Sequence, residues 1–185
     1  MKVIETEFEG LFILEPRIIK DARGHFLEAY NQKTFTEAGL DTVFVQDNQS
    51  RSVRGVLRGL HFQKPPFAQT KLVRALHGVI QDVVVDMRAS QPTFGKHLSI
   101  ELTAESQRQL WIPKGFAHGF LVLSESAEVL YKCDEYYHPE SEGGVFYGDP
   151  ALGIEWMASP TQRIVSVRDL ELRSFSSVIN EFSFD

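Results

Sequence analysis

Hydrophobic residues recur in short runs along almost the whole chain, and the runs are rich in β-branched and aromatic side chains. They read LFILEPRII, HFLEAY, VFVQDN, VLRGLHFQ, KLVRALHGVIQDVVVDM, HLSIEL, QLWIP, HGFLVL, AEVLYKCDEYY and RIVSV. Gaps that contain Gly, Pro, Asp or Ser, such as DARG, SQPTFG and PKG, separate many of them, as turns separate strands. The pattern predicts a mainly β protein in which one long strand begins at Lys71 and continues to Met87.

The spacing of these runs favours an antiparallel sandwich or barrel over alternating strand–helix–strand units. No repeat and no low-complexity linker interrupts the chain, so we predict a single domain over residues 1–185. Its 43% hydrophobic and 24% charged residues are ordinary for a globular protein, and the chain is long enough to bury a core.

Two short helices are predicted at the periphery. The segment NQKTFTEAG has Asn31 as a possible N-cap and Gly39 as a stop. Near the C-terminus, Asp169 is a possible cap before LELRSFSSVINEF. The residues expected on one face of this second helix are Leu170, Phe175, Ile179 and Phe182.

Charge and cysteine content narrow the class of protein. The formal net charge of −6 disfavours nonspecific binding to nucleic acid, which needs a basic surface. The first residues carry scattered charges, unlike a signal peptide, and no stretch approaches the roughly 20 apolar residues that cross a bilayer. The single cysteine, Cys133, forms no intrachain disulfide. We therefore expect a cytoplasmic protein with no membrane and no nucleic-acid partner.

The charge is unevenly distributed, because the segment from Asn48 to Gln81 contains no Asp or Glu. Its basic residues are Arg51, Arg54, Arg58, Lys64, Lys71 and Arg74. A segment that lines a pocket for an anionic ligand would benefit from this composition. An acid-free run of this length also arises by chance in an ordinary β-protein, so the run alone does not establish such a pocket.

His61 lies inside this segment, in the strand VLRGLHFQ. In a regular strand His61 and Arg58 would face opposite sides. A site that uses both needs a break in the alternation, and Gly59 between them could supply a bulge. The alternative is that Arg58 is a solvated charge.

A second informative segment, QLWIPKGFAHGFLVL, places Pro113, Gly115 and His118 in the pattern P-x-G-x-x-H, which resembles the second half-motif of cupin barrels. Metal-binding cupins carry an earlier H-x-H, but this chain has His61-Phe62-Gln63 there. Gln63 and Glu101 could complete a ligand set only in principle, and we predict no metal. Farther along, a tyrosine can donate a proton to a forming carbanion, and the candidates are Tyr131, Tyr136 and Tyr137.

Taken together, several segments resemble the dTDP-4-dehydrorhamnose 3,5-epimerase family, in order and over nearly the whole chain from about Ile4 to the mid-170s. These segments are DARGHFLEAYNQKTF, FVQDNQSRS, VLRGLHFQ, KLVR, SQPTFGKH, QLWIPKGFAHGFLVLSESAEVLYKCDEYYHPESEGG and GIEW. The resemblance implies a cupin-type jelly roll (a double-stranded β-helix) with short peripheral helices. It also implies a homodimer that exchanges N-terminal strands, a dTDP-linked 4-keto-6-deoxy sugar as substrate, and no cofactor.

The resemblance further implies roles for individual residues. His61 matches the base, Asp169 the carboxylate that orients it, Tyr131 the proton donor and Lys71 the cation near the C4 oxygen. The positions matched to substrate binding are Arg23, Phe26, Glu28, Gln46, Asn48, Arg58, Lys71, His118, Tyr137, Glu142 and Arg168. Arg23 and Glu28 are expected to reach across the dimer.

The chain departs from the family pattern at Ile19, Gln49 and Arg168, where an aromatic residue, His and Lys are common. These departures leave the acid and base in place but affect the expected nucleotide or sugar preference. The alternatives are an epimerase that inverts only C3 or C5 of a related sugar nucleotide, a metal-dependent cupin enzyme, and a cupin that only binds sugars.

Overall fold

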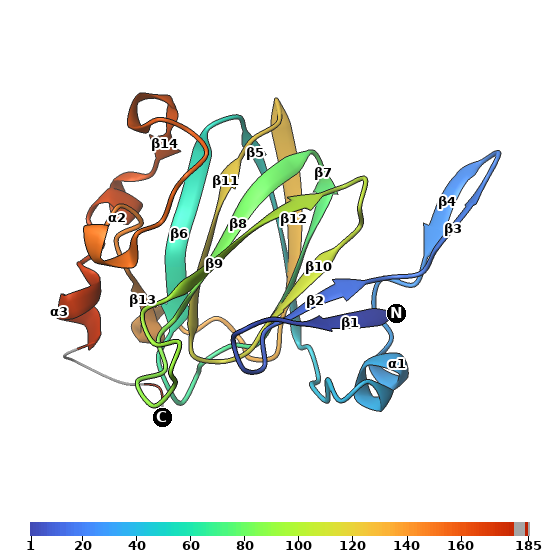
Figure 1. Ribbon diagram of the computed structural model, residues 1–185, viewed down its shortest axis with the longest axis horizontal. Helices are drawn as coiled ribbons and strands as arrows, with labels where there is room; N and C mark the ends of the chain where they lie inside the picture. The colour runs from blue at the N-terminus through green and yellow to red at the C-terminus, as the bar shows by residue number, and fades with distance from the viewer. Residues whose placement is uncertain (180–183, 185) are drawn as a thin grey trace.

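The computed structural model describes residues 1–179 and 184. Two antiparallel sheets form the body of the molecule (Figure 1). The first sheet has the order β1 (Lys2–Glu5), β2 (Phe12–Glu15), β10 (Gln109–Ile112), β7 (Lys71–His77), β12 (Ser126–Cys133) and β5 (Gln46–Val53). The second has the order β13 (Glu142–Gly144), β6 (Val56–Gln63), β11 (Phe116–Val122), β8 (Val79–Asp86) and β9 (His97–Thr103). The predicted mainly β architecture is confirmed.

Short elements surround this body. A separate hairpin of β3 (Ile18–Asp21) and β4 (Gly24–Leu27) projects away from it, and β14 (Ile164–Val165) pairs with β6 in parallel (Figure 1). The helices are α1 (Gln32–Glu37), α2 (Val167–Leu170) and α3 (Phe175–Ile179), and the 3₁₀ turns are η1 (Pro139–Ser141), η2 (Pro150–Leu152) and η3 (Pro160–Gln162). No helix in the described part of the chain is long and apolar enough to span a membrane.

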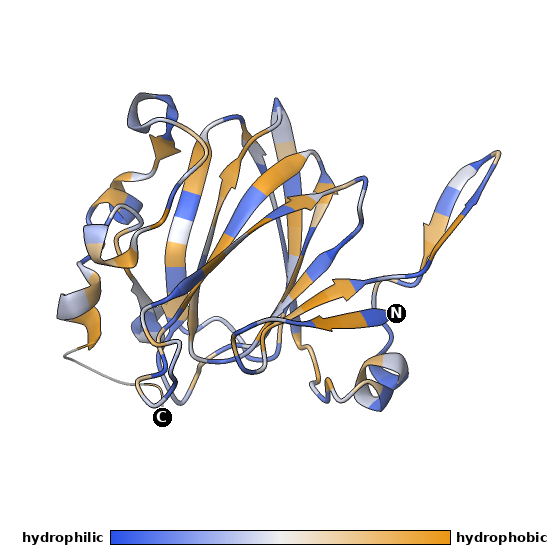
Figure 2. Ribbon diagram, in the orientation of Figure 1, coloured by the Kyte–Doolittle hydropathy of each residue, from blue (hydrophilic) through white to orange (hydrophobic). Residues whose placement is uncertain are grey.

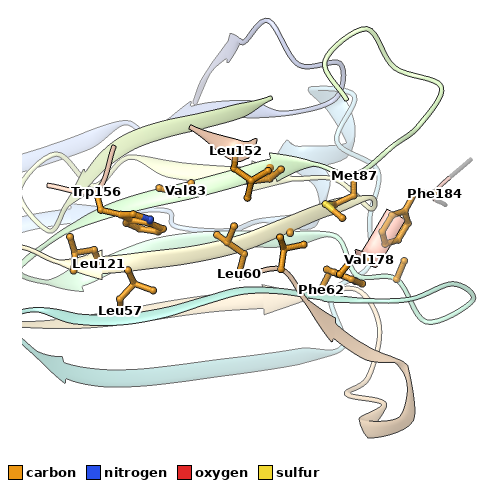
Figure 3. Close-up of a cluster of buried hydrophobic side chains, with 14 residues drawn as sticks. Leu57, Leu60, Phe62, Val83, Met87, Leu121, Leu152, Trp156, Val178 and Phe184 are labelled. Atoms are coloured by element: carbon orange, nitrogen blue, oxygen red, sulfur yellow. The ribbon is translucent and has the colours of Figure 1, made fainter. Parts of the chain in front are cut away.

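Both faces of β8 and β11, in the second sheet, are buried, which explains why these two strands are so apolar. Toward the first sheet, residues such as Ile80, Val84 and Phe120 form one hydrophobic cluster. Toward the outside, alternate residues pack beneath the C-terminal segments, and in Figure 3 Leu57 and Trp156 belong to this outer cluster. Figure 2 shows the corresponding changes between hydrophobic and hydrophilic colour along β6. The C-terminal segments are thereby held against β6, where they contribute to the site.

The prediction of one strand from Lys71 to Met87 is wrong, because the chain turns at Gly78 and passes from β7 in the first sheet to β8 in the second. Gly78 has φ +75°, and a Cβ there would lie 2.1 Å from the Ser126 carbonyl oxygen. Only glycine fits this turn. Apart from this glycine, the apolar run contains no glycine or proline that would indicate a turn.

The first predicted helix is confirmed as α1, since the Asn31 side chain accepts hydrogen bonds from the N–H groups of Lys33 and Thr34. Gly39 follows the end of the helix with φ +82°. The buried residue of α1, Phe35, packs with Leu14 and Trp111 on the outer face of the first sheet.

The prediction of Asp169 as a helix cap is wrong. Ser166 caps α2, and its hydroxyl accepts a hydrogen bond from the Asp169 N–H at 3.1 Å. The single long helix is also wrong, because α2 ends at Leu170, which is 51% exposed, and α3 is separate. Phe175 and Ile179 pack against the outer cluster, whereas Phe182 lies outside the described residues.

Candidate active site

A cavity of about 660 Å³ opens between the two sheets. Strands β5, β7 and β12 line it from the first sheet and β6 and β11 from the second, with segments 137–142 and 164–169 at its side. It brings together most of the residues predicted for the site: Gln46, Asn48, Arg58, His61, Lys71, His118, Tyr131, Tyr137, Glu142, Arg168 and Asp169. Residues from distant parts of the chain thus converge on one pocket.

The break in strand β6 that this site needs is present, as predicted. His61 pairs with His118 and Arg58 with Phe120, so the register of β6 against β11 shifts by one residue between them. Gly59 has φ +116°, and a Cβ there would lie 2.6 Å from the Gly119 Cα. Only glycine permits this close approach.

The shift directs the side chains of β6 to different sides. Leu57, Leu60 and Phe62 belong to the outer cluster (Figure 3), while Arg58 and His61 both line the cavity. Arg58 is therefore not merely a solvated charge on the outer surface. Its Nε donates a hydrogen bond to Ser52 Oγ at 3.2 Å.

His61 is paired with Asp169 of α2. The His61 Nε2 lies 2.7 Å from Asp169 Oδ1, and the Gly59 N–H donates to Asp169 Oδ2 at 3.4 Å. Burial opposes ionisation of Asp169, but the hydrogen bonds and the charge of His61 outweigh it, so the pKa of this carboxyl lies below its ordinary 3.8. Asp169 is thus a buried carboxylate that holds the His61 ring through a hydrogen bond.

Tyr131 and Lys71 lie on the adjacent strands β12 and β7 of the opposite sheet. Lys71 Nζ is 6.0 Å from the centre of the Tyr131 ring. Burial raises the pKa of the Tyr131 phenol above 10, with smaller effects from Cys133, Arg58 and Glu142. Burial also lowers the pKa of the Lys71 ammonium below 10.5. The Tyr131 phenol is therefore protonated at neutral pH.

A second His–Asp pair, which sequence reasoning missed, lies beside the first. His118 Nε2 contacts both oxygens of Asp82, at 3.0 and 2.9 Å, and Asp82 is completely buried on β8. The sequence did hold one sign of this pair: an acidic residue inside the apolar run VIQDVVVDM, because a buried carboxylate needs a hydrogen-bonding partner. Asp82 fixes the orientation of the His118 ring at the cavity wall.

The side of the cavity is formed by an ionic group around Glu142. Its carboxylate accepts a hydrogen bond from the Tyr137 hydroxyl and lies 2.5 Å from the Arg168 guanidinium. Burial raises the pKa of Glu142, but these two partners outweigh it, so the net shift is downward. Arg168, where the family often has Lys, keeps a cation at this position.

Gln63 connects the two loops at the side of the cavity. Its Nε2 donates to the carbonyl oxygens of Phe67 and Tyr136, and its Oε1 accepts from the His138 N–H. The amide is therefore occupied by the backbone. Glu101, the other residue considered as a metal ligand, lines a separate hollow. The geometry thus argues against the ligand set that the metal-dependent alternative requires.

Three of the predicted binding residues do not line the cavity of their own chain. Arg23 pairs with Asp21 at the tip of the projecting hairpin, and Phe26 on β4 is 68% exposed. The Glu28 carboxylate accepts hydrogen bonds from Asn31 and Thr34 near α1. These residues lie apart from the site as this single chain presents it.

Comparison with known proteins agrees with this geometry. The family model described as dTDP-4-dehydrorhamnose 3,5-epimerase matches residues 5–177. The chain belongs to this family. A curated relative of that name from Shigella flexneri is 50% identical over 177 residues, covering 95% of this chain and 96% of the relative.

Solved structures give the same result. The chain is similar to the crystal structure of dTDP-4-dehydrorhamnose 3,5-epimerase from Elizabethkingia anophelis, with a TM-score of 0.92, 48% identity and coverage of 96% of this chain and 97% of that one. It is also similar to dTDP-6-deoxy-D-glucose-3,5-epimerase from Legionella pneumophila in complex with dTDP-4-keto-L-rhamnose, with a TM-score of 0.90, 47% identity and coverage of 95% and 93%. The predicted cupin-type jelly roll of these isomerases is confirmed.

Proposed function

We propose that the protein is a dTDP-4-dehydrorhamnose 3,5-epimerase, an isomerase that converts dTDP-4-dehydro-6-deoxy-D-glucose to dTDP-4-dehydro-L-rhamnose. The observation that carries this proposal is the placement of a His–Asp pair and a protonated tyrosine on opposite sheets of one cavity. Inversion of a carbon next to a ketone needs a base on one face of the sugar and an acid on the other.

The first step is removal of a proton from C3 or C5, which the C4 ketone makes acidic. Asp169 holds His61 through Nε2, so Nδ1 is the nitrogen with the lone pair that accepts the proton. The electron pair of the C–H bond moves to form an enolate, and the negative charge rests on the C4 oxygen. Lys71 and Arg58 line the same cavity and supply positive charge to this oxygen and to the bound anion.

The second step returns a proton to the same carbon from the other face. The Tyr131 hydroxyl donates it, the enolate collapses to the ketone, and the carbon is inverted. The tyrosinate then regains a proton from solvent while the His61 imidazolium loses one, so each cycle balances. Repetition at the second carbon completes the reaction.

The nucleotide diphosphate explains the acid-free segment around His61. Gln46 and Asn48 of β5 offer amides to the cavity, while Arg58 and Arg168 offer guanidinium groups that suit phosphate oxygens. We assign these residues, with His118, Tyr137 and Glu142, to binding of the dTDP-sugar.

We also propose that the protein is a homodimer in which the hairpin of one copy completes the cavity of the other. The exposed Arg23 and Phe26, together with the neighbouring Glu28, lie on an arm that leaves its own body (Figure 1). An exposed aromatic and a cation at the end of such an arm suit a nucleotide base and a phosphate.

Mixed dimers test this arrangement. Arg23→Ala and His61→Ala chains are each weakly active or inactive alone. When the two are combined, the dimer should recover one normal site, because the His61→Ala chain lends its intact Arg23 to the intact His61 of its partner. Activity that never exceeds that of the Arg23→Ala protein would contradict exchange across the dimer.

The reaction itself is tested by proton NMR of dTDP-4-dehydro-6-deoxy-D-glucose with the protein in D₂O. We expect deuterium at both C3 and C5 and the spectrum of dTDP-4-dehydro-L-rhamnose. Exchange at one carbon alone would indicate a single-centre epimerase. No exchange at either carbon would reject this substrate.

A further inference from the structure

Strand β5 carries polar side chains on one face at alternate positions: Gln46, Asn48, Ser50 and Ser52. The first three line the cavity. Three of the four have partners. Gln46 accepts from the Tyr137 N–H at 3.0 Å, Asn48 Nδ2 contacts Cys133 Sγ at 3.8 Å, and Ser52 Oγ accepts from Arg58 Nε at 3.2 Å.

Ser50 differs from the other three. Its hydroxyl oxygen is buried and has no hydrogen-bond partner among the described residues, although Ser50 lines the cavity. Buried polar atoms without partners are rare, because each loses its hydrogen bonds to water without compensation. A serine hydroxyl can turn among three staggered positions, so rotation about χ1 can bring it into the cavity. An occupant with a polar group would then supply the missing partner.

The register places Ser50 close to the reacting atoms. Asn48 pairs directly with Tyr131 across β5 and β12. Ser50, two residues farther along β5 and on the same face, pairs with Val129. Diagonal neighbours of this kind are about 7–8 Å apart, which a sugar ring can span. Ser50 therefore lies beside the part of the cavity where Tyr131 acts.

The chemistry of the side chain restricts what it binds. A hydroxyl both donates and accepts one uncharged hydrogen bond, which suits a sugar hydroxyl. The anionic phosphates are better matched by the guanidinium groups of Arg58 and Arg168. We propose that Ser50 Oγ turns into the cavity and hydrogen-bonds a ring hydroxyl of the sugar, holding the ring in position between His61 and Tyr131. This assignment rests on the proposed epimerase function.

The test compares Ser50→Ala with Ser52→Ala, the partnered serine on the same face of the same strand. We expect Ser50→Ala to keep the melting temperature and the affinity for dTDP alone, since it removes a hydroxyl that has no partner among the residues that the structure describes. Its kcat/KM for dTDP-4-dehydro-6-deoxy-D-glucose should fall by about 3–10-fold, as expected for one lost neutral hydrogen bond. Ser52→Ala should lower the melting temperature, because it leaves Arg58 Nε without its partner.

The proposal is overturned if Ser50→Ala leaves kcat/KM unchanged. It is also overturned if the variant weakens dTDP and the sugar nucleotide equally or lowers the melting temperature as Ser52→Ala does, because that pattern indicates a structural role. Wild-type protein that fails to turn over the substrate would overturn the epimerase function and this assignment with it. An active wild type with an unaffected Ser50→Ala variant would overturn this assignment alone.

Discussion

The cavity contains two His–Asp pairs on neighbouring strands, and they differ in how far they are open to the cavity. His61 and His118 face each other directly in the register of β6 and β11. The His61 side chain is 34% exposed, whereas that of His118 is 8% exposed and its Asp82 is completely buried. Proton exchange with a substrate needs an accessible ring, and of these two histidines His61 is the more exposed.

The two carboxylates also reach their histidines by different routes. Asp82 comes from β8, the strand next to His118 in the same sheet. Asp169 comes from α2, 108 positions along the chain from His61, and is held by the Ser166 cap and by the Gly59 N–H. The His118–Asp82 pair is part of the sheet, while the His61–Asp169 pair is assembled by packing the C-terminal segments onto the sheet. We therefore assign proton transfer to His61. We assign substrate binding to His118, whose ring Asp82 holds in a fixed orientation.

The largest difference is expected between the two histidine variants. His61→Ala removes the base and should lower kcat by about 10²–10⁴-fold. His118→Ala should chiefly raise KM, because it removes a binding contact and leaves the base in place. Steady-state kinetics on both variants measures this. Equal losses of kcat would contradict the division of roles between the two pairs.

A smaller effect is expected from replacing each carboxylate with its neutral amide. Asp169→Asn removes a charge-assisted hydrogen bond of about 1.5–3 kcal/mol from the imidazolium, so kcat should fall roughly 10–100-fold. Asp82→Asn should lower the free energy of unfolding by about 1–3 kcal/mol, because it weakens a fully buried hydrogen bond. It should change kcat less than Asp169→Asn does, because its partner His118 is assigned to binding and not to proton transfer. Urea unfolding and kinetics together test this. A large kcat loss in Asp82→Asn with unchanged stability would reverse the two assignments.

The smallest effect concerns acid stability. The pKa of Asp169 is lower in the folded protein than its ordinary 3.8, so the ionised form stabilises the fold above that pH. This contribution is lost as pH falls through the lowered folded-state pKa. The difference in unfolding free energy between wild type and Asp169→Asn should therefore shrink as the pH falls below about 4. A difference that grows toward low pH would show that the shift has the opposite sign.

The contrast between the pairs also shows which features of the site the sequence could indicate. The bulge at Gly59 was predictable, since a glycine between two candidate residues is a local signal. Asp169 as a partner of His61 followed only from the family resemblance. Its local pattern pointed instead to a helix cap, and the real cap is Ser166, three residues earlier. No periodicity can report a contact between positions so far apart.

The turn at Gly78 and the role of Asp82 were missed for related reasons. A continuous apolar run cannot show where a chain passes from one sheet to the other, because both strands are buried. An acid in such a run signals a buried partner but does not identify it. The sequence likewise gave no sign of the Ser50 hydroxyl, since only the three-dimensional contacts show that it has no partner within the described part of the chain.

The central claim is that base and acid act from opposite faces of the sugar, and Tyr131→Phe in D₂O tests it most directly. Without the phenol, His61 can still remove a proton and return a deuteron from the same face. NMR should therefore show deuterium entering the starting sugar with its configuration kept, while His61→Ala shows no exchange. If Tyr131→Phe still produces the inverted sugar at the wild-type rate, Tyr131 is not the acid and the arrangement proposed for the cavity is wrong.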